Sequence, residues 1–280
     1  LGQVSLDRIE EIFKSEPKIK NDKNYINSKK TIKGLIEAKN LKIRYENSKA
    51  NSLDGIDFKI LPGELVAIVG PVGCGKTTLA KALGRVIDFP KEQLFIDNTD
   101  VRKFDLKYLR SNVAIVPQEA FLFTSTISEN LKFGDPKASI KLVKTSARKA
   151  GLSEDISNFP KGYNTLVGER GITLSGGQRQ RTALGRALLV NAPIVVLDDA
   201  LASVDNKTAS KIIKEIKNDE SKTILMISHQ LSVAATCDRV LVMDKGKIIQ
   251  EGVHNELVEK DGLYKNLWER ELAVKNLEKI

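Results

Sequence analysis

One short stretch constrains the fold of this chain more than any other: the string "GPVGCGKTT" at residues 70–78. It matches the pattern G-x-x-x-x-G-K-[ST] in full, between an apolar run, "ELVAIVG", and a helical pattern, "KTTLAKALGRVI". A short continuous apolar run is typical of a buried parallel strand. The stretch therefore predicts a strand, a glycine-rich loop and a helix, with backbone N–H groups that surround anionic oxygens at the helix N-terminus.

Each residue of this loop is a candidate contact for a nucleotide. Lys76 can reach the β- and γ-phosphates, and Thr77 offers a hydroxyl to Mg²⁺. Cys74 occupies the position of a small residue, where alkylation would block the nucleotide. The alternative is a chance glycine-rich turn, which the flanking strand and helix argue against. The predicted contacts are Gly70, Pro71, Val72, Gly73, Cys74, Gly75, Lys76, Thr77 and Thr78.

A second apolar run, "IVVLDD" at residues 194–199, ends in two adjacent aspartates. Asp198 lies where a buried strand is expected to end, as does the aspartate that holds Mg²⁺ in phosphate-loop ATPases. The alternative is an aspartate that only caps the following turn. Beside an intact phosphate loop, the sequence favours a magnesium ligand.

The string "LSGGQRQR" at residues 174–181 predicts a second anion site. A serine and two glycines precede a run of good helix formers, so the helix would begin with an N-cap and an accessible backbone. One nucleotide rarely needs two phosphate sites in one domain, so this site can serve the γ-phosphate held by another subunit. A plain helix cap would explain Ser175 but not the string that follows. The predicted contacts are Ser175, Gly176, Gly177 and Gln178.

Strands alternate with helices along most of the 280 residues, which predicts an α/β fold with a parallel sheet covered on both faces. "LIEAKNLKIRY" and "SLDGIDFKI" are expected strands before the loop, and "KTILMISH" is one after it. Residues 106–174 carry helical patterns and loops. The segment "DRVLVMDKGKIIQEG" predicts a hairpin that turns at Lys245 and Gly246. The first residues, "LGQVSLDRIEEIF", have helical spacing and are followed by a Lys/Asn-rich linker.

Composition limits the class of protein. Lysine and arginine outnumber acidic residues by 45 to 36, a net charge of +9. The lysines are scattered, which favours a solvated surface over a contribution from lipid headgroups or a nucleic-acid site. The two cysteines, Cys74 and Cys237, lack metal-type spacing and fit a reducing compartment. No run approaches the roughly 18 apolar residues of a membrane helix.

These motifs, in this order, resemble the nucleotide-binding domains of ABC transporters over residues 35–268. The resemblance implies a P-loop NTPase (RecA-like) α/β core with an antiparallel β subdomain and an α-helical subdomain at about residues 106–174. It implies a domain at residues 35–270, preceded at 1–34 by the end of a last membrane helix and a linker, and followed by a helical tail at 271–280. ATP and Mg²⁺ are the implied ligands.

Four further residues take roles from this resemblance. Tyr45 matches the aromatic residue that stacks on adenine, although a tyrosine on a strand edge is equally compatible with the sequence. Gln118 in "VAIVPQ" matches the glutamine that senses Mg²⁺ and touches the membrane domain, which makes the implied metal set Thr77, Gln118 and Asp198. Asp205 matches an aspartate at the seam of the dimer. His229 in "ISHQ" matches the switch histidine that contacts the γ-phosphate.

The strings "VGERG" and "PQEAFLFTSTISEN" resemble exporters in particular. An exporter implies two kinds of partner, a second nucleotide-binding domain and transmembrane domains, with the chain at the cytoplasmic face of a membrane (the inner membrane in a bacterium). No nucleic-acid partner is expected. A nucleic-acid ATPase of this family would carry two motors in one polypeptide, whereas this sequence has one phosphate loop. Such an ATPase would also bind DNA or RNA in a salt-sensitive way.

Asp199 departs from the family pattern, in which glutamate normally polarises the attacking water. A general base needs a hydrogen-bond reach of about 2.6–3.2 Å, so a shorter side chain should allow Mg-ATP binding but slow hydrolysis. The implied catalytic set is Asp199, His229 and Gln118. The departure resembles the degenerate-site half of a heterodimeric exporter, paired with a partner that has glutamate. A homodimer with a slow base, favoured by the intact His229, and a regulatory nucleotide-binding module remain alternatives; Gln230 and "ASVD" also differ from the usual pattern.

Overall fold

The computed structural model describes residues 9–10, 13–22, 25, 31–218 and 221–277. The helix expected at residues 1–13 therefore lies largely outside the described residues; of that range only residues 9–10 and 13 are described, as helical. Within the described ranges, none of the helices is both long and apolar enough to cross a bilayer.

A six-stranded sheet forms the centre of the molecule, in the order β10-β9-β3-β8-β7-β6. Neighbouring strands are parallel except for β10, which pairs with β9 as a hairpin. Every residue of β3, β7 and β8 is buried, which is why these strands are continuous apolar runs. The strands are β3 (Leu65–Val69), β6 (Val113–Val116), β7 (Ile194–Asp198), β8 (Thr223–Ile227), β9 (Arg239–Asp244) and β10 (Lys247–Gly252).

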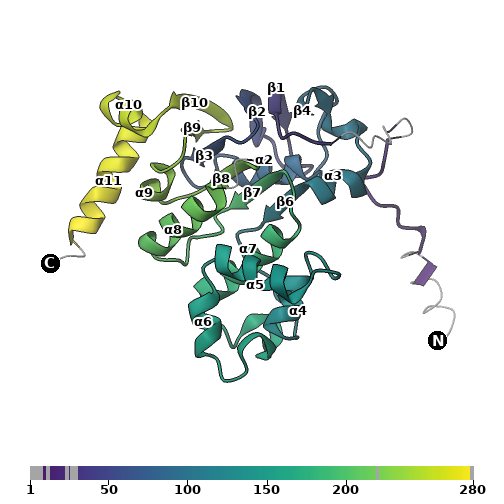
Figure 1. The fold of residues 1–280 in the computed structure, drawn as a ribbon. Coiled ribbons are helices and arrows are strands. Elements are labelled where there is room, and N and C mark those ends of the chain that lie inside the picture. Colours follow the sequence, from purple (N-terminus) through teal and green to yellow (C-terminus); the bar gives the residue numbers. More distant parts are fainter. Residues whose placement is uncertain (1–8, 11–12, 23–24, 26–30, 219–220, 278–280) are drawn as a thin grey trace.

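A smaller antiparallel sheet, in the order β2-β1-β4-β5, packs over one face of the central sheet (Figure 1). Alternate residues of β3 separate the two cores: Val66 and Ile68 pack with the small sheet, whereas Ala67 and Val69 pack with the helices on the other face. The strands are β1 (Ile36–Ile43), β2 (Leu53–Ile60), β4 (Leu94–Ile96) and β5 (Thr99–Asp100).

Helices cover the rest of the molecule, and α4, α5 and α6 form a lobe with α7 below the central sheet (Figure 1). The helices are α2 (Lys76–Leu83), α3 (Leu106–Asn112), α4 (Ile127–Lys132), α5 (Ile140–Lys149), α6 (Ser153–Asn158), α7 (Gly176–Leu189), α8 (Asn206–Lys217), α9 (Leu231–Ala234), α10 (His254–Glu259) and α11 (Leu263–Leu277). Three short 3₁₀ helices are also present: Val101–Lys103, Glu169–Gly171 and Gly162–Asn164.

Two details differ from the sequence-based expectations. The range 106–174 was expected to contain only helices and loops, yet it includes strand β6, which pairs with β7 in the central sheet. Helix α11 begins at Leu263 and runs across the expected boundary between residues 270 and 271. The α/β fold itself, with an antiparallel β part and a helical part, is confirmed.

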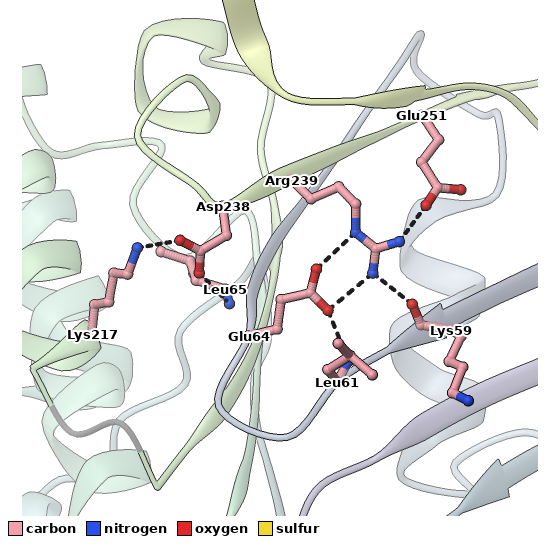
Figure 2. A network of polar contacts seen from close by, with 8 residues as sticks. All are labelled: Lys59, Leu61, Glu64, Leu65, Lys217, Asp238, Arg239 and Glu251. Atoms are coloured by element: carbon pink, nitrogen blue, oxygen red, sulfur yellow. Dashed lines mark hydrogen bonds and ion pairs between the residues drawn. The ribbon is translucent and has the colours of Figure 1, made fainter.

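An arginine joins the two sheets at the end of the molecule where β3 and β9 begin (Figure 2). The guanidinium of Arg239 donates to both carboxylate oxygens of Glu64, at 2.7 and 3.0 Å, and pairs with Glu251 of β10. It also donates to the backbone oxygen of Lys59 in β2, at 2.5 Å. One side chain therefore connects three strands and fixes the small sheet relative to the central one.

Candidate functional site

A cleft of about 230 Å³ opens at the carboxyl ends of β3 and β7. This edge of an open parallel sheet is where ligands bind in α/β proteins. The residues that line the cleft are Ser52, Val72, Gly73, Gly75, Lys76, Thr77, Thr78, Gln118, Asp198, Asp199, Ile227 and His229. The structure thus brings together the phosphate loop, both aspartates, the glutamine and the histidine that the sequence indicated.

The glycines give the loop its path. Gly70 has φ +147°, and a Cβ atom on it would lie 2.0 Å from the carbonyl oxygen of Met243 in β9. A side chain at this position is therefore excluded by a backbone that cannot move aside. Gly73 also has positive φ, and a Cβ there would meet nothing within 4 Å. The space around Gly73 is therefore open, on the side of the loop that lines the cleft.

The loop concentrates positive charge and free donors. Lys76 is 5% exposed, and its ammonium donates to the backbone oxygens of Gly70 and Pro71, both at 2.8 Å. Gly75, the N-cap of α2, has no side chain to cap the helix, so the first N–H groups of α2 have no side-chain acceptor there. A cation and uncapped N–H groups at a helix N-terminus form a site for phosphate. Cys74 is buried beneath them.

The β9–β10 hairpin supports the loop from below. Its turn residues Lys245 and Gly246 both have positive φ, as a tight two-residue hairpin requires. The N–H of Gly246 donates to the carbonyl of Cys74 at 3.0 Å, and its own carbonyl accepts from the N–H of Asp54 at 2.8 Å. One turn residue thus joins the phosphate loop to the small sheet.

Thr77 and Asp198 provide oxygen ligands on one side of the cleft. The Thr77 hydroxyl donates to Oδ1 of Asp198 at 3.1 Å. Burial raises the pKa of Asp198, an effect that the hydrogen bond from Thr77 opposes and the nearby charge of Asp199 reinforces. A bound cation would offset the unfavourable burial of the Asp198 and Asp199 charges. A hydroxyl and a carboxylate are oxygen ligands of the kind that Mg²⁺ prefers. These two residues fit the metal that the sequence predicted.

Asp199 lies at the centre of the cleft in an uncommon backbone conformation. It is 7% exposed and has φ +50°, a region that aspartate adopts more readily than glutamate. Its N–H donates to the carbonyl of Ile227 at 3.0 Å, and its Oδ2 accepts from the amide of Gln118 at 3.4 Å. The exposed His229 lines the same cleft from beyond the end of β8.

Tyr45 lies at the edge of this site, two residues after β1. Its hydroxyl is 3.3 Å from that of Thr78 in the first turn of α2, and the residue is 39% exposed. The ring is therefore beside the phosphate loop and accessible to a ligand.

The string at residues 175–178 does not line this cleft. Ser175 is exposed and caps α7: its hydroxyl accepts the N–H of Gln178 at 3.2 Å, while the Gln178 side chain accepts the N–H of Ser175 at 2.9 Å. Gly176 and Gly177 lie against Ser203, whose carbonyl oxygen would be 2.7 Å from a Cβ atom on Gly177. Gly177 is thus where backbone approaches backbone, whereas Gly176 lies against the Ser203 side chain.

Asp205 is also outside the cleft, exposed at the N-terminus of α8. Its carboxylate accepts the N–H of Thr208 at 2.9 Å, and this hydrogen bond lowers the pKa of Asp205. The residue that the resemblance assigned to a dimer seam is therefore on the surface and does not line the nucleotide cleft of its own chain.

Sequence reasoning missed two lining residues, Ser52 and Ile227. Ile227 is an ordinary apolar residue of a buried strand. Ser52 lies close to the loop: its carbonyl oxygen would be 2.4 Å from a Cβ atom on Gly75. Neither residue type carries a chemical signal, so only the pairing of strands could have indicated them.

Comparisons with known proteins identify the family of this chain. The family model described as ABC transporter matches residues 53–202. The multidrug resistance-like ATP-binding protein MdlA of Buchnera aphidicola is 38% identical over 276 residues, which cover 96% of this chain and 46% of that protein. The ATP-dependent lipid A-core flippase of Aromatoleum aromaticum is 39% identical over 242 residues, 84% of this chain and 40% of that protein.

A solved structure gives the same result. A bacterial Atm1-family ABC exporter with ATP bound matches with a TM-score of 0.90 and 33% identity, over 96% of this chain and 47% of that one. The chain spans a little under half the length of these relatives. On sequence and on structure, the chain belongs to the ABC transporter family, as an ATP-binding domain homologous to those of multidrug and lipid exporters.

Proposed function

We propose that this chain binds and hydrolyses ATP as the motor of an exporter, and that its own site is the slow one of a pair. The observation that carries the proposal is Asp199. Every other element of the cleft is present, yet the base is a buried aspartate held in a left-handed conformation. A partner domain with glutamate at this position would perform most of the hydrolysis.

The roles of the cleft residues follow from where they lie. Lys76 and the backbone N–H groups of residues 72–78 would hold the β- and γ-phosphates, and the Tyr45 ring would stack on the base. Thr77, Asp198 and Gln118 would hold Mg²⁺, which supplies charge neutralisation between the phosphates. His229 would contact the γ-phosphate, and Asp199 would orient the attacking water.

A second nucleotide-binding domain would complete the site. Ser175 at the N-terminus of α7 is exposed and does not line the cleft of its own chain, which supports a contact with a nucleotide held by another chain. The capping arrangement leaves the N-terminus of α7 ordered without a partner, because Ser175 and Gln178 satisfy each other. In a head-to-tail pair, the string "LSGGQ" at residues 174–178 of this chain, its signature, would complete the partner's site and serve the partner's hydrolysis.

A large groove supports the proposed contact with transmembrane domains. It measures about 870 Å³ and lies between α3 and the helical lobe, with Pro117, Phe121, Phe133 and Arg186 among its lining residues. Phe121 and Phe133 each pack against Phe123, yet they are 54% and 59% exposed, an exposed aromatic surface of the kind that marks interaction sites. The groove begins one residue before Gln118, so an element docked there would be coupled to the cleft. In such an exporter the chain would lie at the cytoplasmic face of the membrane.

ATP turnover by the purified chain tests the proposal, measured alone and after addition of a partner domain that has the catalytic glutamate. Tight Mg-ATP binding, near-zero turnover alone and strong activity on mixing are expected. Robust turnover alone that rises steeply with protein concentration would contradict the degenerate site. It would support instead a homodimer in which Asp199 is an adequate base, the alternative that the intact His229 favours.

A regulatory nucleotide-binding module is the remaining alternative. It predicts tight ATP binding with no stimulation of any partner. The mixing experiment separates the two hypotheses. If the chain is a motor domain, residues 174–178 complete the partner's site and the partner's hydrolysis increases; if the chain is a regulatory module, the partner's hydrolysis does not change.

A further inference from the structure

The turn that carries His229 is fixed at its first end by the central sheet. Strand β8 ends at Ile227, and the N–H of Ser228 then donates to the carbonyl oxygen of Ile68 in β3, at 3.2 Å. Helix α9 begins at Leu231, only two residues after His229. The position of the histidine in the cleft is therefore set by the turn between the end of β8, which β3 holds, and the first residue of α9.

The second end of the turn is fixed from a distant part of the chain. Gln230 is the N-cap of α9 but makes no side-chain capping bond. Glu271 supplies the cap instead: Oε2 accepts the N–H of Leu231 at 2.5 Å, and Oε1 accepts the N–H of Ser232 at 3.1 Å. A carboxylate at a helix N-terminus satisfies free N–H groups and interacts favourably with the helix dipole.

Glu271 is itself well held. It lies on α11 with its side chain 17% exposed, and Lys275 donates to it at 2.6 Å from the next turn. Burial alone would raise the pKa of Glu271, but the hydrogen bonds from Lys275 and from α9 outweigh burial and keep the pKa below its usual value. The carboxylate is therefore charged at neutral pH. Tyr264 anchors the start of α11, fully buried with its hydroxyl 2.8 Å from Nδ1 of His254.

Helix α9 also contacts the other outward-facing element. The hydroxyl of Ser232 is 3.3 Å from Oδ1 of Asn206, the first residue of α8 and the neighbour of Asp205. The same short helix is thus linked to the histidine turn and to the aspartate predicted at the dimer seam. Among the described residues, Glu271 accepts the N–H groups of Leu231 and Ser232 at the start of α9, and it lies outside the turn that carries His229.

We propose that Glu271 is a positioning residue for the switch histidine. By capping α9 it fixes the second end of the turn, and so it holds His229 toward the γ-phosphate of a nucleotide in the cleft. Helix α11 is then a working part of the ATP site although none of its residues lines the cleft. The inference rests on the role proposed above for His229.

Amide hydrogen exchange, resolved at single residues, tests the contact without any catalysis. In the full protein, Glu271→Ala should speed exchange of the Leu231 and Ser232 amides by about tenfold or more, because each loses its acceptor. Glu271→Gln, which keeps one acceptor oxygen, should give a smaller increase. Glu269→Ala, an exposed glutamate on the same helix, is the matched control and should change neither amide.

Two exchange results would overturn the proposal. One is an unchanged rate at Leu231 and Ser232 in Glu271→Ala. The other is an equal rise along the whole of α11, because Glu271 would then anchor that helix rather than position the turn.

A double-mutant cycle tests the action through the histidine. In an Asp199→Glu background, Glu271→Ala should lower the single-turnover rate of this chain's own site by about tenfold through misplacement, with ATP affinity within about twofold. In a His229→Ala background, the same change should have no further effect. Multiplicative losses would show that Glu271 acts independently of His229 and would refute the proposal. If the Asp199→Glu protein has no turnover, the proposed defect of Asp199 is wrong, and the exchange result still decides the role of Glu271.

Discussion

Substitution of Asp199 by glutamate is the sharpest test of the slow site. The added methylene moves the carboxylate forward by about 1.5 Å, the length of one C–C bond. The distance range in which a base can hydrogen-bond to its water is only about 0.6 Å wide, from about 2.6 to 3.2 Å. The aspartate carboxylate is therefore set back by more than the whole range of usable hydrogen-bond distances. A correctly positioned base increases the rate by about 10²–10⁴-fold. We expect Asp199→Glu to raise single turnover at this site by about 10²-fold, or ~2.7 kcal/mol of activation free energy.

The backbone opposes part of this gain. Asp199 has φ +50°, where side chains other than asparagine and aspartate cost about 1 kcal/mol. The glutamate variant should therefore unfold about 2–4 °C lower than the native chain. Asp199→Asn is the matched control, because asparagine tolerates this conformation and has the same size but cannot act as a base.

The assay is hydrolysis of radiolabelled ATP with protein in excess, in a pair whose partner base has been changed to glutamine so that only this site reports. ATP affinity is measured in parallel by calorimetry. Equal turnover for the aspartate and glutamate proteins at unchanged affinity would refute the argument from reach. A fall of tenfold or more in Asp199→Asn from a robust native rate would show that aspartate is already a working base.

Three further outcomes are expected. Lys76→Ala should weaken Mg-ATP binding by about 10- to 100-fold, since a hydrogen bond to a charged group contributes about 1.5–3 kcal/mol; unchanged affinity in calorimetry would refute the phosphate loop. Ser175→Arg should leave this chain's own ATP affinity intact and lower the partner's hydrolysis by about 10²-fold, whereas an effect confined to its own site would rule out the head-to-tail pair. Arg239→Ala should cost about 2 kcal/mol of unfolding free energy, because Glu64 loses both of its hydrogen bonds from Arg239; Lys265→Ala, which breaks an exposed pair, should cost under about 1 kcal/mol in the same urea titration.

Local patterns predicted the parts of this molecule that depend on local chemistry. The phosphate loop could be identified because its glycines, Lys76 and the flanking apolar run occupy consecutive positions. The turn at Lys245 and Gly246 could be placed because a tight hairpin needs residues that accept positive φ. Strand β6 was not predicted, since the four residues "VAIV" are too few to distinguish a buried strand from part of a helix.

Features that join distant segments had no such signal. Nothing in the residues around Asp199 indicates that its backbone is left-handed or that its N–H donates to Ile227 of a neighbouring strand. Glu271 is 40 residues from the amide that it caps, in a helix whose sequence resembles any charged surface helix. Motifs therefore named the candidates for the site, whereas their arrangement, with residues 175–178 outside their own cleft, required the structure.

The hairpin turn beneath the phosphate loop has a practical consequence for anyone who labels this protein. In the printed sequence, Lys245 and Gly246 are a polar turn of the kind usually chosen for a tag or an inserted reporter. Yet the backbone of Gly246 forms hydrogen bonds with Cys74 in the phosphate loop and with Asp54 in the small sheet. An insertion at this turn would therefore break the contacts that support the phosphate loop.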